Sequence, residues 1–351
     1  MNKVKTKAGI CIFSIALLLG GCGKESGSTN LAKGMEFVEK YEFQSALDSF
    51  ETALLGDEDK QLSYRGQGIA YMGLGNYADA EAAFLKSLEY AKHRFRVDGV
   101  EFDTNYYLAA AYMKQGKYAD AEKIYSSILE LRKKEKDAYY LRACAILRQN
   151  RYDDAVKDFE KALSLDPDNL DLVTDAFVEM QAAGFDEQGK AYVQKYMEGK
   201  DKKLKDTQKG IIYYYLGDYE QAHLLLDGSI NGNDPNVSMV LGQAYEKLGN
   251  LEYAATVYRT YLDSHDPNAA LYNSLGVCLM SQQKYGEAKE AFEKGIAIGS
   301  SDYLQELRFN LIVANEYLGE FSQAKSLIQE YLQYYPDDAA AKKENEFLQT
   351  R

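Results

Sequence analysis

Residues 68–84, GIAYMGLGNYADAEAAF, decide the fold, because they combine two helical patterns with one turn. Gly68 and Ala80 are small residues at which two helices can approach each other closely, and Phe84 follows one turn later to fill the space between them. Gly75 stands between the two patterns, and glycine adopts the positive φ of a helix C-terminus without steric cost. The stretch therefore predicts a helix, a turn at Gly75 and a second helix.

The same pattern recurs along the chain. Residues 143–162, ACAILRQNRYDDAVKDFEKA, and residues 276–292, GVCLMSQQKYGEAKEAF, repeat it. The small residue of the second helix returns every 32 to 41 residues, apart from one gap of 67 between Ala155 and Ala222. Because that gap is close to two periods, we expect a repeat near Gly189 that has lost most of its signature. The series consists of Ala46, Ala80, Ala121, Ala155, Ala222, Ala254, Ala288 and Ala324.

These segments resemble the tetratricopeptide repeat, a helix–turn–helix unit of about 34 residues. The resemblance covers residues 31–336 and implies about nine repeats, one of them degenerate near 170–200. It implies an all-α, right-handed superhelical solenoid and no cofactor. The tail, residues 337–351, is expected to form a polar capping helix, with Asp337 and Asp338 at its favourable N-terminal end.

Proline and glycine agree with this arrangement. A proline inside a helix costs about 3 kcal/mol, so an all-helical array should confine its prolines to the junctions between repeats. The chain has only four, and each falls at such a junction: Pro167, Pro235, Pro267 and Pro336. The turn glycines are Gly75, Gly116, Gly217, Gly249 and Gly319, for which we predict positive φ.

One insertion departs from the period. Seven extra residues lie within residues 90–102, YAKHRFRVDGVEF, between the second and third repeats. They predict two lengthened helices that meet at Asp98 and Gly99. This extension is either a solvated surface or a contact for a partner. The basic run from Lys200 to Lys209 has the same two interpretations.

The N-terminus reads as a targeting signal. Three lysines precede an apolar stretch, residues 8–20, that is short for a bilayer span. The stretch ends in Leu19-Gly20-Gly21-Cys22, which resembles the lipobox of bacterial lipoproteins. The resemblance implies that residues 1–21 form a signal peptide and that Cys22 carries a lipid. Residues 22–30 would be the lipidated cysteine and a flexible tether, which holds the protein on the extracytoplasmic face of the cell membrane, or in the periplasm of a cell with two membranes. A plain secretory signal or an uncleaved anchor is the alternative.

Composition excludes several classes of protein. The chain has 351 residues, a formal net charge of −13, 30 Tyr and no Trp. A protein that binds nucleic acid needs a basic surface, and this chain is acidic, so no nucleic acid is expected as a partner. The hydrophobic fraction of 46% is too high for a disordered chain, and four Cys are too few for a disulfide scaffold.

No motif for catalysis or metal binding is present. The three histidines, His93, His223 and His265, have no second His or Cys at ligand spacing, so no metal site is expected. The chain contains no nucleophile elbow and no phosphate-binding loop ahead of a helix. Cys144 and Cys278, four repeats apart, are expected to be packing residues that do not pair. We therefore predict that the protein is not an enzyme.

The resemblance instead implies a partner groove lined by the first helix of each repeat. The lining predicted by the family's groove positions is aromatic and rich in Met, which suits a peptide or a partner helix. The charge pattern with which some members clamp a carboxylate is incomplete, because its Asn residues are missing. The alternative is a groove that is merely solvated or filled by the chain's own terminus. The lining residues are Arg65, Met72, Tyr106, Met113, Lys114, Tyr140, Leu147, Arg148, Tyr214, Tyr215, Met239 and Tyr317.

Three functions fit these observations. The first is a membrane-tethered scaffold or adaptor that binds a protein or peptide of the cell envelope. The second is a structural component of an envelope machine for wall synthesis, secretion or appendage assembly. The third is a protein that binds carbohydrate or muropeptide, because exposed Tyr rings can stack on sugars.

Overall fold

The computed structural model describes residues 29–91, 99–299, 301–336 and 338–351. These residues form α-helices and two short 3₁₀ turns, with no strand among them. The lipobox and most of the tether lie outside the described residues. Within the described ranges, no helix combines the length and the apolar character needed to cross a membrane.

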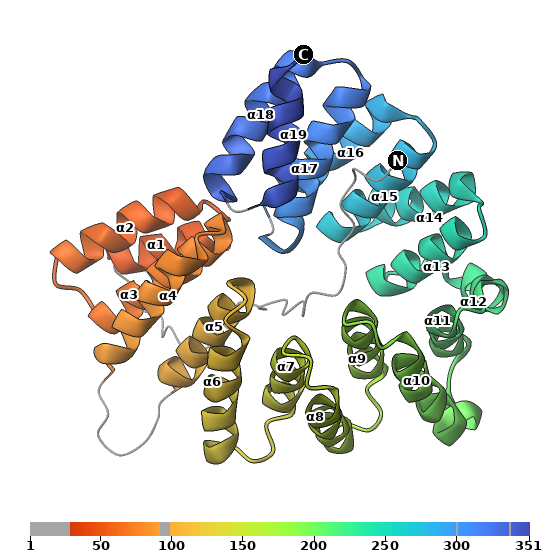
Figure 1. Ribbon diagram of the computed structural model, residues 1–351, viewed down its shortest axis with the longest axis horizontal. Coiled ribbons are helices and arrows are strands. Elements are labelled where there is room, and N and C mark those ends of the chain that lie inside the picture. Colours follow the sequence, from red (N-terminus) through yellow and green to blue (C-terminus); the bar gives the residue numbers. More distant parts are fainter. Residues whose placement is uncertain (1–28, 92–98, 300, 337) are drawn as a thin grey trace. The chain divides into compact units, whose positions relative to one another are not determined.

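The chain divides into two compact units after Asn169. The N-terminal unit, residues 29–169 of the described chain, consists of four helical hairpins (Figure 1). Its helices are α1 (Asn30–Glu39), α2 (Phe43–Leu55), α3 (Lys60–Leu74), α4 (Tyr77–Glu89), α5 (Gly99–Lys114), α6 (Tyr118–Leu131), α7 (Lys136–Leu147) and α8 (Tyr152–Leu165).

The C-terminal unit, residues 170–351, continues the same pattern of hairpins and ends in a single helix. The first hairpin, α9 and α10, occupies the region where the degenerate repeat is predicted. The helices are α9 (Leu170–Ala182), α10 (Asp186–Lys200), α11 (Asp206–Leu216), α12 (Tyr219–Leu226), α13 (Pro235–Lys247), α14 (Leu251–Ser264), α15 (Ala269–Ser281), α16 (Tyr285–Ala297), α17 (Ser301–Tyr317), α18 (Phe321–Tyr334) and α19 (Ala339–Gln349). The predicted all-α solenoid of helical hairpins is confirmed.

Each unit has two layers of helices. Within each unit, the two helices of a hairpin pack against each other, and each hairpin packs against the next helix along the chain. In addition, odd-numbered helices of adjacent hairpins contact one another; for example, α1 contacts α3, and α15 contacts α17. The odd-numbered helices of a unit therefore form one layer and the even-numbered helices the other (Figure 1).

Glycine and an aromatic ring interlock inside the hairpins. A methyl group on Gly68 would overlap the ring of Phe84, and one on Gly276 would overlap the ring of Phe292. Both rings are fully buried. The predicted role of these small residues, close approach of two helices, is therefore confirmed.

The turns between paired helices follow the sequence signals. The five predicted glycines have φ between 73° and 89°. At two equivalent turns a non-glycine residue adopts this left-handed conformation: Asn150 with φ 61° and Gln283 with φ 62°. All four prolines lie outside helix interiors, and Pro235 is the first residue of α13.

Two further expectations are tested at α4, α5 and α19. The α4 helix ends at Glu89 and is not lengthened, whereas α5 begins at Gly99 and has 16 residues. Residues 92–98 lie outside the described chain. Asp338 caps α19 by accepting hydrogen bonds from the amides of Ala340 and Ala341, as its position predicts.

Candidate functional site

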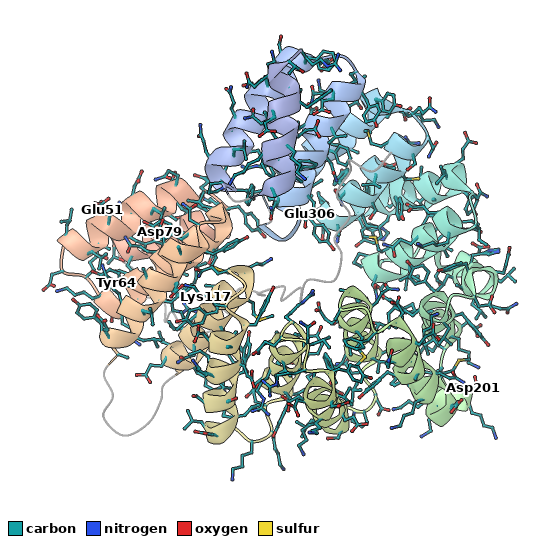
Figure 2. The ribbon with its side chains drawn as sticks, viewed as in Figure 1. Glu51, Tyr64, Asp79, Lys117, Asp201 and Glu306 are labelled. Atoms are coloured by element: carbon teal, nitrogen blue, oxygen red, sulfur yellow. The ribbon has the colours of Figure 1, made fainter. Side chains whose placement is uncertain are left out.

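The residues predicted to line a groove fall on the odd-numbered helices or, for Arg148, at the residue that caps one of them. We call the exposed side of these helices the odd-helix face of each unit: α1, α3, α5 and α7 in the N-terminal unit, and α9, α11, α13, α15 and α17 in the C-terminal unit. Figure 2 shows Glu306 on the odd-helix side of the C-terminal unit and Asp201, which follows α10, on the opposite side. Cys22, the predicted lipidation site, lies outside the described residues.

In the N-terminal unit, Arg65 of α3 is a nearly buried cation. Its side chain is only 11% exposed, and its guanidinium lies 5.3 Å from the centre of the Tyr107 ring. An Nη atom lies 3.8 Å from a carboxylate oxygen of Asp103. A ring and a carboxylate of the neighbouring helix α5 therefore hold this charge in place.

The two predicted tyrosines of this unit pack against other rings. Tyr106 lies edge-on to Phe102, with the ring centres 5.3 Å apart, and burial raises the pKa of its hydroxyl. Tyr140 lies beside Phe159 at 5.8 Å. Both side chains are half-buried, so each presents only part of its ring to solvent.

The remaining predicted residues of this unit differ in exposure. Leu147 is only 1% exposed and offers no surface to a partner. Met72 and Met113 are half-buried against the hydrophobic cores. Arg148 is half-buried, and Lys114 at the end of α5 is exposed.

In the C-terminal unit, the structure brings Tyr214 and Tyr215 together on α11. Their ring centres lie 5.2 Å apart in an edge-on arrangement, and Tyr215 makes a similar contact with Phe177 of α9 at 5.3 Å. Burial is the main reason that the pKa of Tyr215 rises to about 12. Tyr317 is 41% exposed and stacks on Tyr285. Met239 accepts a hydrogen bond on its sulfur from the Ser274 hydroxyl at 3.1 Å.

Two acidic residues on α9 were not among the residues that the sequence predicts to line a groove. Asp171 and Asp175 lie one helical turn apart and are both exposed. Although solvent reaches Asp175, surrounding protein raises the pKa of its carboxyl to about 7, and the charges of Asp171 and Glu179 add to this. The α9 helix lacks the repeat signature, so no groove position was assigned to it. A run of acids four residues apart was the signal available.

Histidine 223 is the centre of a separate polar cluster. Its Nδ1 lies 3.3 Å from Asp227 and its Nε2 lies 3.1 Å from Glu220. The Tyr245 hydroxyl donates to Asp227 at 2.7 Å. Across the described chain, no group of three His, Cys, Asp or Glu side chains is arranged to hold a metal ion.

Cys144 and Cys278, the two cysteines of the described chain, are buried, and neither forms a disulfide, as predicted. The Cys278 thiol donates to the carbonyl oxygen of Leu251 at 3.2 Å, and burial raises its pKa to about 11. A thiol with a raised pKa holds little thiolate at neutral pH and is a poor nucleophile.

Three known proteins illustrate what this chain is similar to in sequence or fold. BBSome complex member bbs-4 of Caenorhabditis elegans is 24% identical over 134 residues, which is 38% of this chain and 29% of that protein. This chain thus matches less than a third of the relative's length. A solved tetratricopeptide repeat protein from Parabacteroides merdae is 16% identical, with a TM-score of 0.46, over 81% of this chain and 97% of the other. MamA from Desulfovibrio magneticus is 18% identical, with a TM-score of 0.42, over 50% and 98% of the two chains.

The family itself is shown by the sequence. The tetratricopeptide repeat model matches residues 31–93, 106–169, 207–265 and 239–303, which together make up more than half of the chain. Three of these segments contain hairpins whose helices interlock through glycine and an aromatic ring, whereas the segment 106–169 has alanine in place of the glycine. The chain therefore belongs to the tetratricopeptide repeat family.

Proposed function

We propose that this protein is a membrane-tethered scaffold, outside the cytoplasm, that binds a protein or peptide partner through its odd-helix faces. The observation that carries the proposal is the exposed aromatic surface on these helices. Tyr317 stays 41% exposed while stacked on Tyr285, and Tyr214 is half-buried beside Tyr215. Tyrosine offers a rigid, amphipathic contact with little entropy to lose, and it is enriched in protein interfaces.

Crosslinking in cells tests the binding surface. Full-length protein would be crosslinked in its native membranes, captured, and its partners identified by mass spectrometry. We expect the Tyr214→Ala/Tyr317→Ala variant to lose a partner that the wild type captures. The matched control, Leu224→Ala/Tyr253→Ala, removes two exposed apolar side chains from even-numbered helices of the same unit and should keep that partner. Identical partner sets for all three proteins would refute the proposal.

The tether is tested separately through Cys22. Cells grown with an alkyne-labelled fatty acid should incorporate the label into the wild type, and the protein should sediment with membranes. The Cys22→Ser variant should remain unlabelled. A variant that still acquires the label would exclude Cys22 as the lipidation site.

A further inference from the structure

The odd-helix face of α9, α11 and α13 has an excess of negative charge. The α9 helix contains Asp171, Asp175 and Glu179 and neither Lys nor Arg. Among the described residues, no cation lies within ion-pair distance of Asp171 or Asp175. Two exposed carboxylates thus stand one helical turn apart without a counter-charge.

Aromatic rings adjoin these carboxylates. The Thr174 side chain, between the two aspartates in sequence, hydrogen-bonds to the hydroxyl of Tyr215, and the ring of Tyr215 packs edge-on against Phe177. Asp171 and Asp175 lie on the same helix as Phe177, and that helix contacts α11, so the two carboxylates adjoin Tyr215. Both charges raise the pKa of Tyr215. The carboxylates and the tyrosine therefore belong to one continuous surface.

The surface continues onto α13 through Glu246. This carboxylate accepts a hydrogen bond from Tyr258 at 2.9 Å, and its charge raises the pKa of Tyr214. Burial holds the pKa of Glu246 above its ordinary value. The helices α9, α11 and α13 contain two cations, Lys209, which is paired with Asp201 at 2.8 Å, and Lys247 at the end of α13.

We propose that the odd-helix face of α9, α11 and α13 binds a Lys- or Arg-rich segment of a partner protein. The cationic side chains would lie over the rings of Tyr214 and Tyr215, with their charges directed to Asp171 and Asp175. Cations are attracted both to aromatic faces and to carboxylates that lack a counter-charge. The inference rests on the proposed scaffold function and names the chemistry of the partner.

Binding of a defined peptide tests this inference. The probe is a fluorescein-labelled decapeptide of alternating Lys and Ala, titrated with the purified full-length protein in detergent. Its counterpart with Glu in place of Lys measures charge preference. We expect the Lys peptide to bind, the Glu peptide not to bind, and the affinity for Lys to fall as salt is raised from 50 to 300 mM.

Two isosteric variants locate the site. At pH 8, above the pKa of about 7 that the protein gives Asp175, Asp171→Asn/Asp175→Asn should weaken binding of the Lys peptide about tenfold, because two ion pairs are lost. Glu290→Gln/Glu293→Gln makes the same change of net charge on exposed residues of α16 and should change the affinity less than twofold. Circular dichroism melts would confirm that both variants fold.

The outcomes separate the two proposals. Equal weakening by the two variants, or equal binding of Lys and Glu peptides, overturns the basic-segment inference, while the crosslinking result for Tyr214 and Tyr317 stands on its own. If the Lys peptide binds as expected but crosslinking shows no dependence on those tyrosines, the carboxylate site on α9 stands, while the placement of cations over the Tyr214 ring and the broader binding surface are both wrong.

Discussion

The odd-helix faces of the two units share one repeat fold and differ in how their charges are satisfied. In the N-terminal unit, Arg65 lies between the Tyr107 ring and the Asp103 carboxylate, so the cation is compensated inside the protein. In the C-terminal unit, Asp171 and Asp175 face solvent, and no cation of the described chain lies beside them. The repeat pattern determines which helices form the odd-helix face, but it does not determine which charged residues lie on that face.

The largest expected effect tests whether the two units are energetically separate. Phe84→Ala and Phe292→Ala each remove a fully buried ring, one in each unit, and should each cost about 3–5 kcal/mol. Because each repeat contacts only its neighbours, hydrogen exchange should accelerate mainly in the unit that carries the substitution. Equal acceleration in both units would show that they unfold together.

A second comparison uses pH, because two carboxylates have pKa shifts of opposite sign. Glu58 accepts hydrogen bonds from the amides of Asn30 and Leu31 at the start of α1, which lowers its pKa. Its stabilisation is therefore present above the unfolded pKa and is lost as pH falls through the folded value. Asp175 has its pKa raised from 3.8 to about 7, so its contribution is present below 3.8 and is lost as pH rises through about 7.

The two amide substitutions should consequently act in opposite directions. At pH 8, Glu58→Gln should lower the unfolding free energy of the N-terminal unit by about 1 kcal/mol, the usual value of a helix cap. Asp175→Asn should stabilise the C-terminal unit at pH 8, by less than about 1 kcal/mol because water screens this exposed group. The effect of Asp175→Asn should vanish at pH 3, where that carboxyl is protonated, and the effect of Glu58→Gln should shrink as pH falls through the lowered pKa of Glu58. Thermal melts at the two pH values measure this, and effects of the same sign at pH 8 would contradict the assignments.

The smallest effect concerns the turns with left-handed residues. Gln283 in the C-terminal unit and Asn150 in the N-terminal unit both have positive φ. In this left-handed conformation a residue other than Gly, Asn or Asp costs about 1–2 kcal/mol, while glycine has an entropic cost of about 0.5–1 kcal/mol. Gln283→Gly should therefore stabilise by about 0.5 kcal/mol and Asn150→Gly by about zero. Urea denaturation measures the stability of both variants. A larger gain in stability for Asn150→Gly than for Gln283→Gly would contradict this account.

Local geometry could be predicted from the sequence where one residue dictates one conformation. The turn glycines, the proline junctions and the cap at Asp338 follow from steric and hydrogen-bonding requirements of single residues. The contact between Gly68 and Phe84 could also be predicted, because the small residue leaves the space that the large ring fills.

The lining of the faces could be predicted only in part. A repeat position gives the side of a helix, but it does not give the depth at which neighbouring hairpins bury that side, so Leu147 is inaccessible and Tyr317 is exposed. Asp171 and Asp175 were missed because α9 has no signature residue from which to count. Glu58 caps α1 from 28 residues away in sequence, a contact that arises only once the first hairpin is folded.

The interlocked glycines and rings limit which amino-acid substitutions such a protein can accumulate. Since the Phe84 ring occupies the space that a side chain at Gly68 would need, neither position tolerates a single larger or smaller substitution without loss of packing. Variation at these sites must come in compensating pairs. Exposed residues of the odd-helix faces, such as Asp171 and Asp175, fill no such space, so one substitution at a time at these residues can redirect the protein to another ligand while the scaffold stays intact.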